Sequence, residues 1–357
     1  MNKDNLSLIM NITFEIHELN QFKKNWLVTG AAGFIGSNLT EYLLKMNQSV
    51  VAIDNFVTGR KINLEKIKEN VSASQWNNLE FIECDITSYD TCKKITSNID
   101  VVLHQAALGS VPRSINDPIK SNDSNVSGFL NLIQAANLNG VKRFVFASSS
   151  SVYGDNARLP KVEEITGNLL SPYAVTKYAN ELYASVFNKC YGMETVGLRY
   201  FNVFGRRQDP NGVYAAVMPK WIKQILDKEP LYINGDGETS RDFTYIDNVV
   251  QANILAATTK NTAAFGTVFN IAAGGKETLN NLYQKIVDQI KSKLPELEIN
   301  DPIYRDFRAG DIRHSNASIE KAKDTLGYNP THTLEEGLID SISWYIEDLL
   351  LSESKVK

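Results

Sequence analysis

The chain has 357 residues, of which 43% are hydrophobic and 22% are charged, and its formal net charge at pH 7 is −4. These values are ordinary for a soluble globular protein. The small negative charge argues against a nucleic-acid partner, because phosphate binding depends on clustered Lys and Arg. No apolar run approaches the ~20 residues of a membrane span, and no basic segment precedes a leader cleavage site. We therefore expect a protein that binds neither nucleic acid nor membrane.

The cysteines and histidines indicate a reducing compartment and no metal site. Cys84, Cys92 and Cys190 are widely spaced and form no C-x-x-C pair, so the cytoplasm is the simplest location. The four histidines show no ligand spacing. Residues 1–22 precede the first strand signal and form an N-terminal extension without an assigned role.

In chain order, short apolar runs alternate with segments of helical periodicity. The predicted strands are Trp26 to Thr29, Val50 to Asp54, Leu79 to Cys84, Val101 to His104, Phe144 to Ala147 and Thr195 to Leu198. One long helix begins at Asp117-Pro118 and continues to Gly140, and a second begins at Ser171-Pro172 and ends near Cys190. Strands that are apolar throughout, separated by helices, imply a parallel sheet covered on both faces. The pattern predicts a doubly wound, Rossmann-like α/β fold.

After residue 200 the pattern loosens into Gly and Pro clusters, which predicts a smaller, irregular α+β lobe. Segments 245–259 and 267–272 are apolar and are expected to return to the sheet. The expected domains are therefore a Rossmann domain of residues 23–200 plus about 244–273, and a discontinuous second lobe of about 201–243 plus 274–357.

The first predicted strand leads into three glycines spaced as G-x-x-G-x-x-G, at Gly30, Gly33 and Gly36. Such a turn lets a phosphate approach the backbone and directs a helix N-terminus toward it. The next strand ends in Asp54, whose carboxylate would bind the adenosine ribose and repel a 2′-phosphate. No cation follows immediately, because Asn55 and Phe56 come next. The pattern favours NAD over NADP, and a purely structural glycine turn is the alternative.

A tyrosine and a lysine stand four residues apart at Tyr173 and Lys177 on the second long helix, hence on one face. A phenol is a weak base at neutral pH, but a nearby ammonium and a positive nicotinamide ring would both favour its phenolate. The strand before this helix ends in four serines, residues 148–151. Burying an unpartnered hydroxyl costs roughly 1–3 kcal/mol, so this row is expected in a turn or facing a polar site.

Together these motifs and Arg199-Tyr-Phe-Asn202 resemble the extended short-chain dehydrogenase/reductase family, specifically its nucleotide-sugar epimerases, over roughly residues 22–348. The segments 106–114, 199–212 and 234–243 are similar to those of bacterial UDP-N-acetylglucosamine 4-epimerases. The resemblance implies that Ser149, Tyr173 and Lys177 are catalytic, and that hydride passes from the sugar C4 to bound NAD and returns to the opposite face of a 4-keto sugar. It also implies a role in surface polysaccharide synthesis.

The remaining site residues are likewise those that the resemblance implies. Cofactor contacts are expected from Gly30, Gly33, Phe34, Ile35, Gly36, Asp54, Asn55, Gly59, Asp85, Ile86, Gln105, Ala106, Ala107, Asn125, Tyr173, Lys177 and Tyr200. UDP-sugar contacts are expected from Ser149, Ser150, Ser151, Asn202, Ala216, Val217, Tyr232, Arg241, Arg308, Asp311 and Ser315.

Substrate choice is expected to depend on a gate residue after Gly310-Asp311, which falls on Ser315. In the family a small gate residue accepts N-acetyl sugars, so UDP-N-acetylglucosamine and UDP-N-acetylgalactosamine are the predicted pair. UDP-glucose 4-epimerase is the alternative, followed by a uronic-acid epimerase in which Arg113 binds the sugar carboxylate. A non-catalytic NAD-sensing module is the alternative from a different class. The helices that begin at 118 and 172 are expected to pair across a homodimer, as in the family.

Overall fold

The computed structural model describes residues 23–211, 215–307 and 313–354, with the side chains of 349–354 excepted. In this part of the chain seven parallel strands form one sheet in the order β11, β6, β5, β4, β1, β2, β3. Their bounds are β1 Asn25–Thr29, β2 Ser49–Asp54, β3 Leu79–Glu83, β4 Val101–His104, β5 Arg143–Ser149, β6 Glu194–Tyr200 and β11 Thr267–Ile271. The predicted doubly wound fold is confirmed, and the six predicted strands correspond to β1 through β6.

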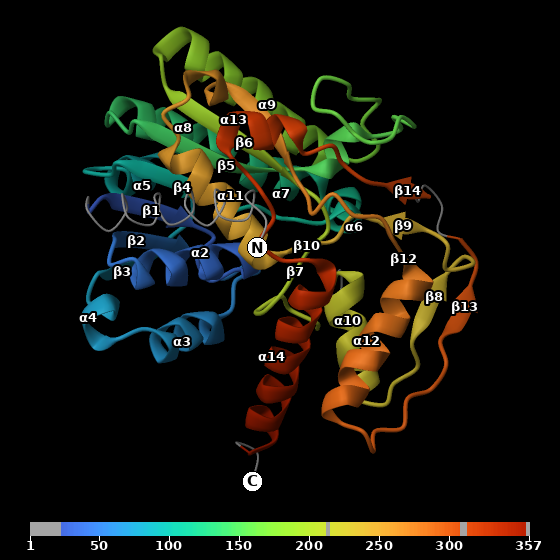
Figure 1. Cartoon of the computed structure of the whole chain (residues 1–357). Helices are drawn as coiled ribbons and strands as arrows, with labels where there is room; N and C mark the ends of the chain where they lie inside the picture. The colour runs from blue at the N-terminus through green and yellow to red at the C-terminus, as the bar shows by residue number, and fades with distance from the viewer. Residues whose placement is uncertain (1–22, 212–214, 308–312, 355–357) are drawn as a thin grey trace, which may run out of the picture.

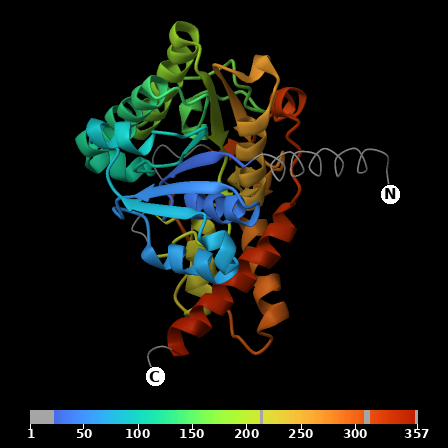
Figure 2. The same ribbon diagram turned by 90° about the vertical axis from the view of Figure 1, so that its left-hand side faces the viewer.

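Helices cover both faces of the sheet (Figures 1 and 2). One face packs against α2 (Phe34–Lys45) and α11 (Ile246–Thr258), with α3 (Lys61–Asn70) and α4 (Ala73–Trp76) outside them. The other face packs against α5 (Tyr89–Ile95), α8 (Gly128–Leu138) and α9 (Pro172–Tyr191). Neighbouring residues of β1 divide between these layers: Val28 belongs to the first core and Leu27 to the second. This division explains why the strands read as apolar at every position.

The helix predicted from 118 to 140 is wrong in one respect, because it is not a single regular α-helix. It consists of α7 (Pro118–Asn122), a π-helical turn η1 (Asp123–Ser127) and α8. Asn125 lies in the π turn, where its side chain accepts from the Leu108 backbone N–H at 2.7 Å and donates to the Thr176 hydroxyl at 3.1 Å. A π turn places one side chain out of the regular helical register, and here that side chain anchors the loop after β4.

Segment 246–258 returns to the sheet as the covering helix α11, whereas Thr267–Ile271 joins it as the edge strand β11. The remaining elements near the sheet are α6 (Val111–Asn116), the 3-10 turns η2 (Ser150–Tyr153) and η3 (Thr262–Ala264), and α13 (Glu320–Leu326). Among the described residues no helix is both long and apolar enough to cross a membrane.

The second lobe combines strands of two or three residues with three longer helices, and much of it lies at the lower right of Figure 1. Its strands are β7 (Val203–Phe204), β8 (Tyr232–Asn234), β9 (Ser240–Arg241), β10 (Thr244–Tyr245), β12 (Glu277–Thr278), β13 (Ile303–Arg305) and β14 (His314–Ser315). Its helices are α10 (Val217–Leu226), α12 (Leu279–Lys293) and α14 (Leu334–Ser354). The strands pair as β10–β7, β12–β9–β14 and β13–β8, so the lobe has no extended sheet of its own in the described part of the chain.

Candidate active site and cofactor cleft

A cleft of about 800 Å³ opens where β1, β2, β4 and β5 end. In a doubly wound sheet the carboxyl ends of the strands around the reversal of strand order form the usual ligand crevice. The reversal here lies between β1 and β4, because the chain leaves β1 for β2 on one side and later returns to β4 on the other. The fold therefore places the cleft where a dinucleotide binds in this architecture.

The turn between β1 and α2 is packed too tightly for a side chain at two of its glycines. Gly30 has φ +67°, and a Cβ there would lie 2.9 Å from the Ala106 backbone N. A Cβ on Gly36 would lie 2.1 Å from the Gly30 carbonyl oxygen. Gly33 is the N-cap of α2 and provides no side-chain acceptor for the first turn. The turn thus leaves the start of α2 available to an anion, as a pyrophosphate requires.

Asp54 ends β2 with its carboxylate fixed by backbone donors. Oδ2 accepts from the Ala32 N–H at 3.0 Å, and Oδ1 accepts from the Phe56 N–H at 2.8 Å. Burial raises the pKa of Asp54 above its ordinary value, and these backbone hydrogen bonds oppose that shift. A Cβ on Gly59 would lie 2.5 Å from Asp54 Oδ1, so the close packing of residue 59 against the carboxylate requires a glycine.

Most of the residues predicted to bind the cofactor line this one cleft, although they come from five strand ends. The lining residues are Gly30, Gly33, Phe34, Ile35, Gly36, Asp54, Asn55, Asp85, Ile86, Gln105, Ala106, Ala107, Tyr173 and Tyr200. Gly59, Asn125 and Lys177 are not among the lining residues. Asn125 is 1% exposed and anchors Leu108, and Lys177 is buried behind Tyr173.

The three predicted catalytic residues converge at the end of β5 and the start of α9. Ser171 caps α9 by accepting from the Ala174 N–H at 3.1 Å, and Pro172 follows it. Lys177 Nζ donates to the Ala147 carbonyl at 2.8 Å and lies 5.9 Å from the centroid of the Tyr173 ring. Ser149 and Tyr173 both line the cleft, and Ser149 is close enough to the Tyr173 hydroxyl to act on its pKa. The site therefore presents two neighbouring hydroxyls to the cleft, with the Lys177 ammonium beside the Tyr173 ring.

Burial dominates the pKa of Tyr173 in the chain by itself. It raises this pKa above its ordinary value, and the neighbouring Ser149 opposes that change. Burial also lowers the pKa of Lys177 to about 8. The expectation that Lys177 and the positive nicotinamide ring of bound NAD together favour the Tyr173 phenolate stays a prediction.

The serine row is divided by the end of the strand. Ser149 is the last residue of β5 and accepts from the Ser151 N–H at 3.2 Å, while Ser150 and Ser151 begin η2. Ser148, Ser149 and Ser150 line the cleft. Ser151 does not, and its buried hydroxyl has no partner among the described residues.

The predicted substrate residues divide between the cleft and the second lobe. Asn202 and Ala216 line the cleft. Ser315 on β14 pairs with Arg241 on β9, and the Arg305 guanidinium stacks over the Tyr232 ring, 3.2 Å from its centroid. Val217 is the first residue of α10. Arg308 and Asp311 lie outside the described residues.

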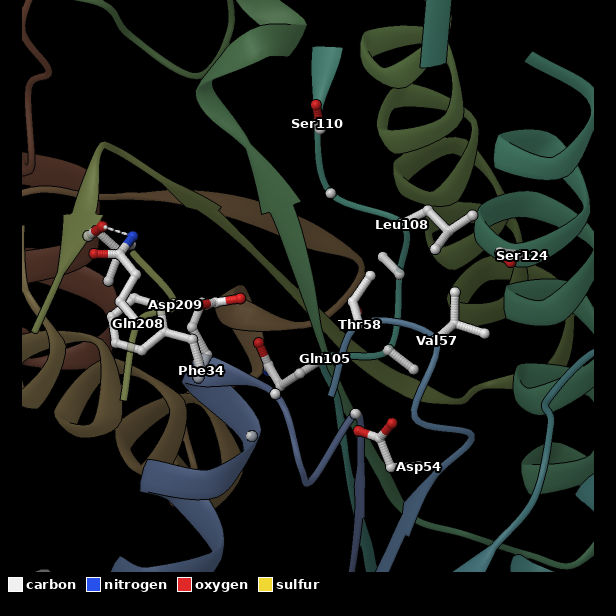
Figure 3. A pocket seen from close by; sticks show the side chains of 18 of the residues that line it. Phe34, Asp54, Val57, Thr58, Gln105, Leu108, Ser110, Ser124, Gln208 and Asp209 are labelled. Carbon is white, nitrogen blue, oxygen red and sulfur yellow. Dashed lines mark hydrogen bonds between the residues drawn. The ribbon is translucent and has the colours of Figure 1, made fainter. Parts of the chain in front are cut away.

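Sequence reasoning missed the loops that close the cleft from the sides. Figure 3 shows Asp54 at the base, Phe34 with Gln208 and Asp209 on one side, and Val57, Thr58 and Leu108 on the other. Arg60 also lines the cleft, and its Nη1 lies 3.6 Å from Asp209 Oδ1. Leu108 belongs to segment 106–114, and Gln208 and Asp209 belong to segment 199–212. The similarity of these two segments to those of nucleotide-sugar epimerases is the sequence signal that could have indicated these cleft residues.

These features define an enzyme class: a doubly wound protein with a glycine turn, an acid at the end of β2, and a Ser and a Tyr on one cleft with a Lys beside the Tyr ring. The residues fit a dinucleotide, because Gly30 and Gly36 leave no room for a Cβ and α2 begins without a side-chain cap.

Comparison with known proteins gives the same class. Residues 26–272 match the family described as "NAD dependent epimerase/dehydratase family". A solved UDP-N-acetylglucosamine 4-epimerase from Methanobrevibacter ruminantium M1, in complex with UDP-N-acetylmuramic acid, is 40% identical with a TM-score of 0.82, over 91% of this chain and 99% of that one. The solved UDP-glucose 4-epimerase of Thermotoga maritima is 35% identical with a TM-score of 0.81, over 91% and 99%. The UDP-glucuronate 4-epimerase of Thermodesulfobacterium geofontis is 34% identical over 333 residues, 92% of this chain and 98% of its own.

The chain belongs to the NAD dependent epimerase/dehydratase family, and NAD is its cofactor. The predicted resemblance to nucleotide-sugar epimerases of the extended short-chain dehydrogenase/reductase type is confirmed.

Proposed function

We propose that this enzyme interconverts UDP-N-acetylglucosamine and UDP-N-acetylgalactosamine by reversible oxidation at C4 of the sugar. The coarser activity, 4-epimerisation of a UDP-sugar, is supported by the three relatives above, whose names agree on UDP and on C4 and differ in the sugar. The observation that carries the proposal is that Ser149 and Tyr173 line the same cleft as the glycine turn, with Lys177 buried against the Tyr173 ring.

Each of these residues has a separate task. Tyr173 takes the proton of the 4-hydroxyl and later returns it, and Ser149 hydrogen-bonds to the same oxygen while it changes between alcohol and ketone. Lys177 contributes the positive charge that favours the phenolate of Tyr173. When bound, NAD supplies the acceptor for the C4 hydride and the donor that returns it, so the reaction has no net redox change.

The UDP group is assigned to the second lobe. Asn202 and Ala216 lie on the cleft, and Arg241 and Tyr232 extend the site onto β9 and β8. An arginine suits a diphosphate because its guanidinium donates two parallel hydrogen bonds. Val217, Arg308 and Asp311 are proposed to complete this site, and Ser150, which lines the cleft, to bind the sugar.

The preference for N-acetyl sugars rests on the size of Ser315. Ser315 on β14 pairs with Arg241 on β9. The proposed gate residue therefore lies next to the arginine that is proposed to bind the diphosphate. A serine leaves room beside the sugar that a tyrosine would fill. The 40% identity to a UDP-N-acetylglucosamine 4-epimerase supports the same choice.

A panel of four UDP-sugars (N-acetylglucosamine, N-acetylgalactosamine, glucose and glucuronic acid), assayed without added NAD, tests the proposal. We expect the N-acetyl pair to be interconverted fastest, with NAD retained by the protein. Conversion of glucose alone would identify a UDP-glucose 4-epimerase. A protein that binds NAD and leaves every sugar unchanged would be a sensor rather than an enzyme.

A uronic-acid epimerase is the second candidate, favoured by the 34% identity to a UDP-glucuronate 4-epimerase. Arg113 lies on α6, which packs against α9 beside the cleft residues Val111 and Pro112. If UDP-glucuronate is the best substrate, Arg113→Met should raise its KM about tenfold or more and leave UDP-glucose unaffected.

We also propose that the enzyme is a cytoplasmic homodimer. Ile119 of α7 and Val175, Leu182 and Val186 of α9 are large apolar residues that are about half exposed or more, as expected of a face covered by a second copy. The three cysteines form no disulfide, which supports a reducing compartment. Light scattering of the wild type should give twice the chain mass, and Leu182→Glu should give one chain mass. A wild-type monomer would contradict the proposal.

A further inference from the structure

A buried ion pair lies directly behind the catalytic groups. The Arg199 guanidinium on β6 donates from Nε and Nη2 to the two carboxylate oxygens of Glu181 on α9, both at 2.8 Å. The hydroxyl of Ser148, which precedes Ser149 on β5, donates to Glu181 Oε1 at 2.5 Å. The side chains of Arg199 and Glu181 are 3% and 7% exposed. The three groups therefore form a closed polar cluster that none of the proposed catalytic roles explains.

Glu181 shares a helix face with Tyr173 and Lys177. The three residues are four positions apart along α9, so each is one helical turn from the next. Lys177 is 3% exposed, and among the described residues the Ala147 carbonyl is the one hydrogen-bond partner of its ammonium. A buried cation of this kind tends to lose its proton: burial lowers the pKa of Lys177 to about 8, and the Glu181 carboxylate acts in the opposite direction.

The cost of the pair argues that it does more than hold the fold together. Replacing a buried ion pair by apolar side chains of similar size is often neutral or stabilising, because two charges must be desolvated. Packing alone would therefore not require charge between α9 and β6. Its position one turn from Lys177 gives the charge a use.

We propose that Glu181 is the buried counter-charge that keeps Lys177 protonated, and so is a positioning residue that acts on Tyr173 through Lys177. Arg199 and Ser148 hold the carboxylate in place and satisfy its oxygens. The inference rests on the catalytic roles proposed above for Tyr173 and Lys177, and it concerns which residues maintain them.

The other charged and titratable groups around Lys177 do not replace Glu181. His104 on β4 is neutral, because burial lowers its pKa to about 3, and the Lys177 ammonium also lowers it. Glu163 is turned toward β11, where its carboxylate accepts from the Asn270 N–H at 2.7 Å. The remaining groups on elements packed against α9 are Tyr153 of η2, whose ring lies 4.9 Å from the Arg199 guanidinium, Arg143 at the far end of β5, Glu194 at the far end of β6, Tyr200 at the near end of β6, Arg113 of α6, Lys120 of α7 and Asp123 of η1. The Tyr200 hydroxyl donates to Gln105 Oε1 at 3.2 Å and carries no charge, because burial raises its pKa. Helix α8 and strand β11 contain no titratable side chain.

The molecule contains a matched control pair. At the opposite end of the same two strands, Arg143 on β5 donates from Nε and Nη2 to Glu194 Oε2 on β6, at 3.1 and 2.7 Å. The side chains of Arg143 and Glu194 are 9% and 21% exposed. Glu194→Gln therefore removes a carboxylate from a comparable pair that lies far along the strands from Tyr173.

The experiment measures the ionisation of Tyr173 in the holoenzyme. The near-ultraviolet difference spectrum between each variant and the same variant carrying Tyr173→Phe reports the phenolate as pH is raised. We expect Glu181→Gln to move this titration to higher pH by about one unit, a tenfold lower phenolate fraction at a given pH, because Lys177 then loses its proton sooner. Removal of the Glu181 carboxylate also acts directly on Tyr173, because the loss of a negative charge lowers the pKa of the phenol. Glu181 is two helical turns from Tyr173 and Lys177 is only one, so the effect through Lys177 is the larger.

The controls separate this role from a merely structural one. Glu181→Asp should restore at least half of the displacement, and Glu194→Gln should lower thermal stability without moving the titration. If Glu181→Gln does not fold, the double variant Glu181→Gln, Arg199→Met is used, because it leaves no unpaired guanidinium. Its Tyr173 titration is also expected to move to higher pH. A titration that stays in place or moves to lower pH overturns the inference. The spectrum needs no sugar, so failure of every UDP-sugar to react would overturn the proposed function and leave this result separate.

Discussion

The two halves of the molecule differ in what they offer to a ligand. The cofactor half offers backbone: Gly30 and Gly36 leave no room for a Cβ, and Asp54 is fixed by two backbone N–H groups. In the second lobe the residues proposed to bind the UDP-sugar, such as Arg241 and Ser315, act through side chains on strands of two residues each. A site shaped by backbone changes little when side chains are exchanged, whereas a site made by a few side chains changes its ligand readily. Under the proposed assignment, this difference accounts for relatives named as 4-epimerases of different UDP-sugars.

The largest effect is expected from Tyr173→Phe, which removes the proton acceptor and leaves the shape of both halves intact. We expect kcat to fall by about 10³-fold, within the range for loss of a general base. The NAD content per chain and the KM for the UDP-sugar should stay within about twofold of wild type. Stopped assays with chromatographic separation of the epimers measure kcat, and an undiminished rate would contradict the catalytic role.

A methyl group in the glycine turn tests whether backbone shape determines cofactor binding. Gly36→Ala places a Cβ 2.1 Å from the Gly30 carbonyl oxygen, and we expect a loss of about 2 kcal/mol or more of stability together with loss of bound NAD.

Gly109→Ala is the matched control for that substitution, because Gly109 also lines the cleft and a Cβ there meets nothing within 4 Å. This variant should retain NAD and wild-type stability. The bound NAD released by denaturation and the midpoint of thermal unfolding provide both measurements. Equal NAD retention by the two variants would show that the turn is not what holds the cofactor.

Ser315→Tyr tests whether a single side chain of the second lobe determines which sugar is accepted. If this position limits the sugar pocket, kcat/KM for the N-acetyl pair should fall about 30-fold, corresponding to roughly 2 kcal/mol of lost room for the substituent. UDP-glucose turnover should remain within about twofold. Ser315→Ala, which keeps the pocket open, should behave as wild type. Equal losses for all sugars in Ser315→Tyr would remove Ser315 from the gate.

The smallest effect is a pair of opposite pH slopes in stability. The pKa of Lys177 is lowered from 10.5 to about 8 by burial, so the folded chain binds fewer protons than the unfolded chain between these values. Stability due to Lys177 is present above pH 10.5 and is lost as pH falls through 8. The pKa of Asp242 in the second lobe is raised from 3.8 to about 6 by burial. Stability due to Asp242 is present below pH 3.8 and is lost as pH rises through 6.

Chemical denaturation at a series of pH values measures both slopes. Lys177→Met should abolish the rise in stability between pH 8 and 10.5, and Asp242→Asn should abolish the fall between pH 3.8 and 6. Each substitution should leave the other window unchanged. A slope that persists after its residue is replaced belongs to a different group.

Much of the cofactor half could be predicted because its signals are local. The apolar runs that became β1 to β6 are buried on both faces, and Ser171-Pro172 caps α9 as expected. Fourteen of the predicted cofactor residues line one cleft. Asn125 does not, because the π turn directs it to the Leu108 backbone. The apolar pattern of the sequence does not predict a π turn, because such a turn inserts only a single residue into an otherwise helical segment.

The sequence by itself determined the fold class and the dinucleotide turn, because both depend on residues that are neighbours along the chain or one strand apart. Tertiary structure alone decided which distant charges share a buried space. Glu181 meets Ser148 across 33 positions and Arg199 across 18. Only the packing of α9 and β6 against β5 removes these groups from water, and the same desolvation raises the pKa of Tyr173 and lowers that of Lys177.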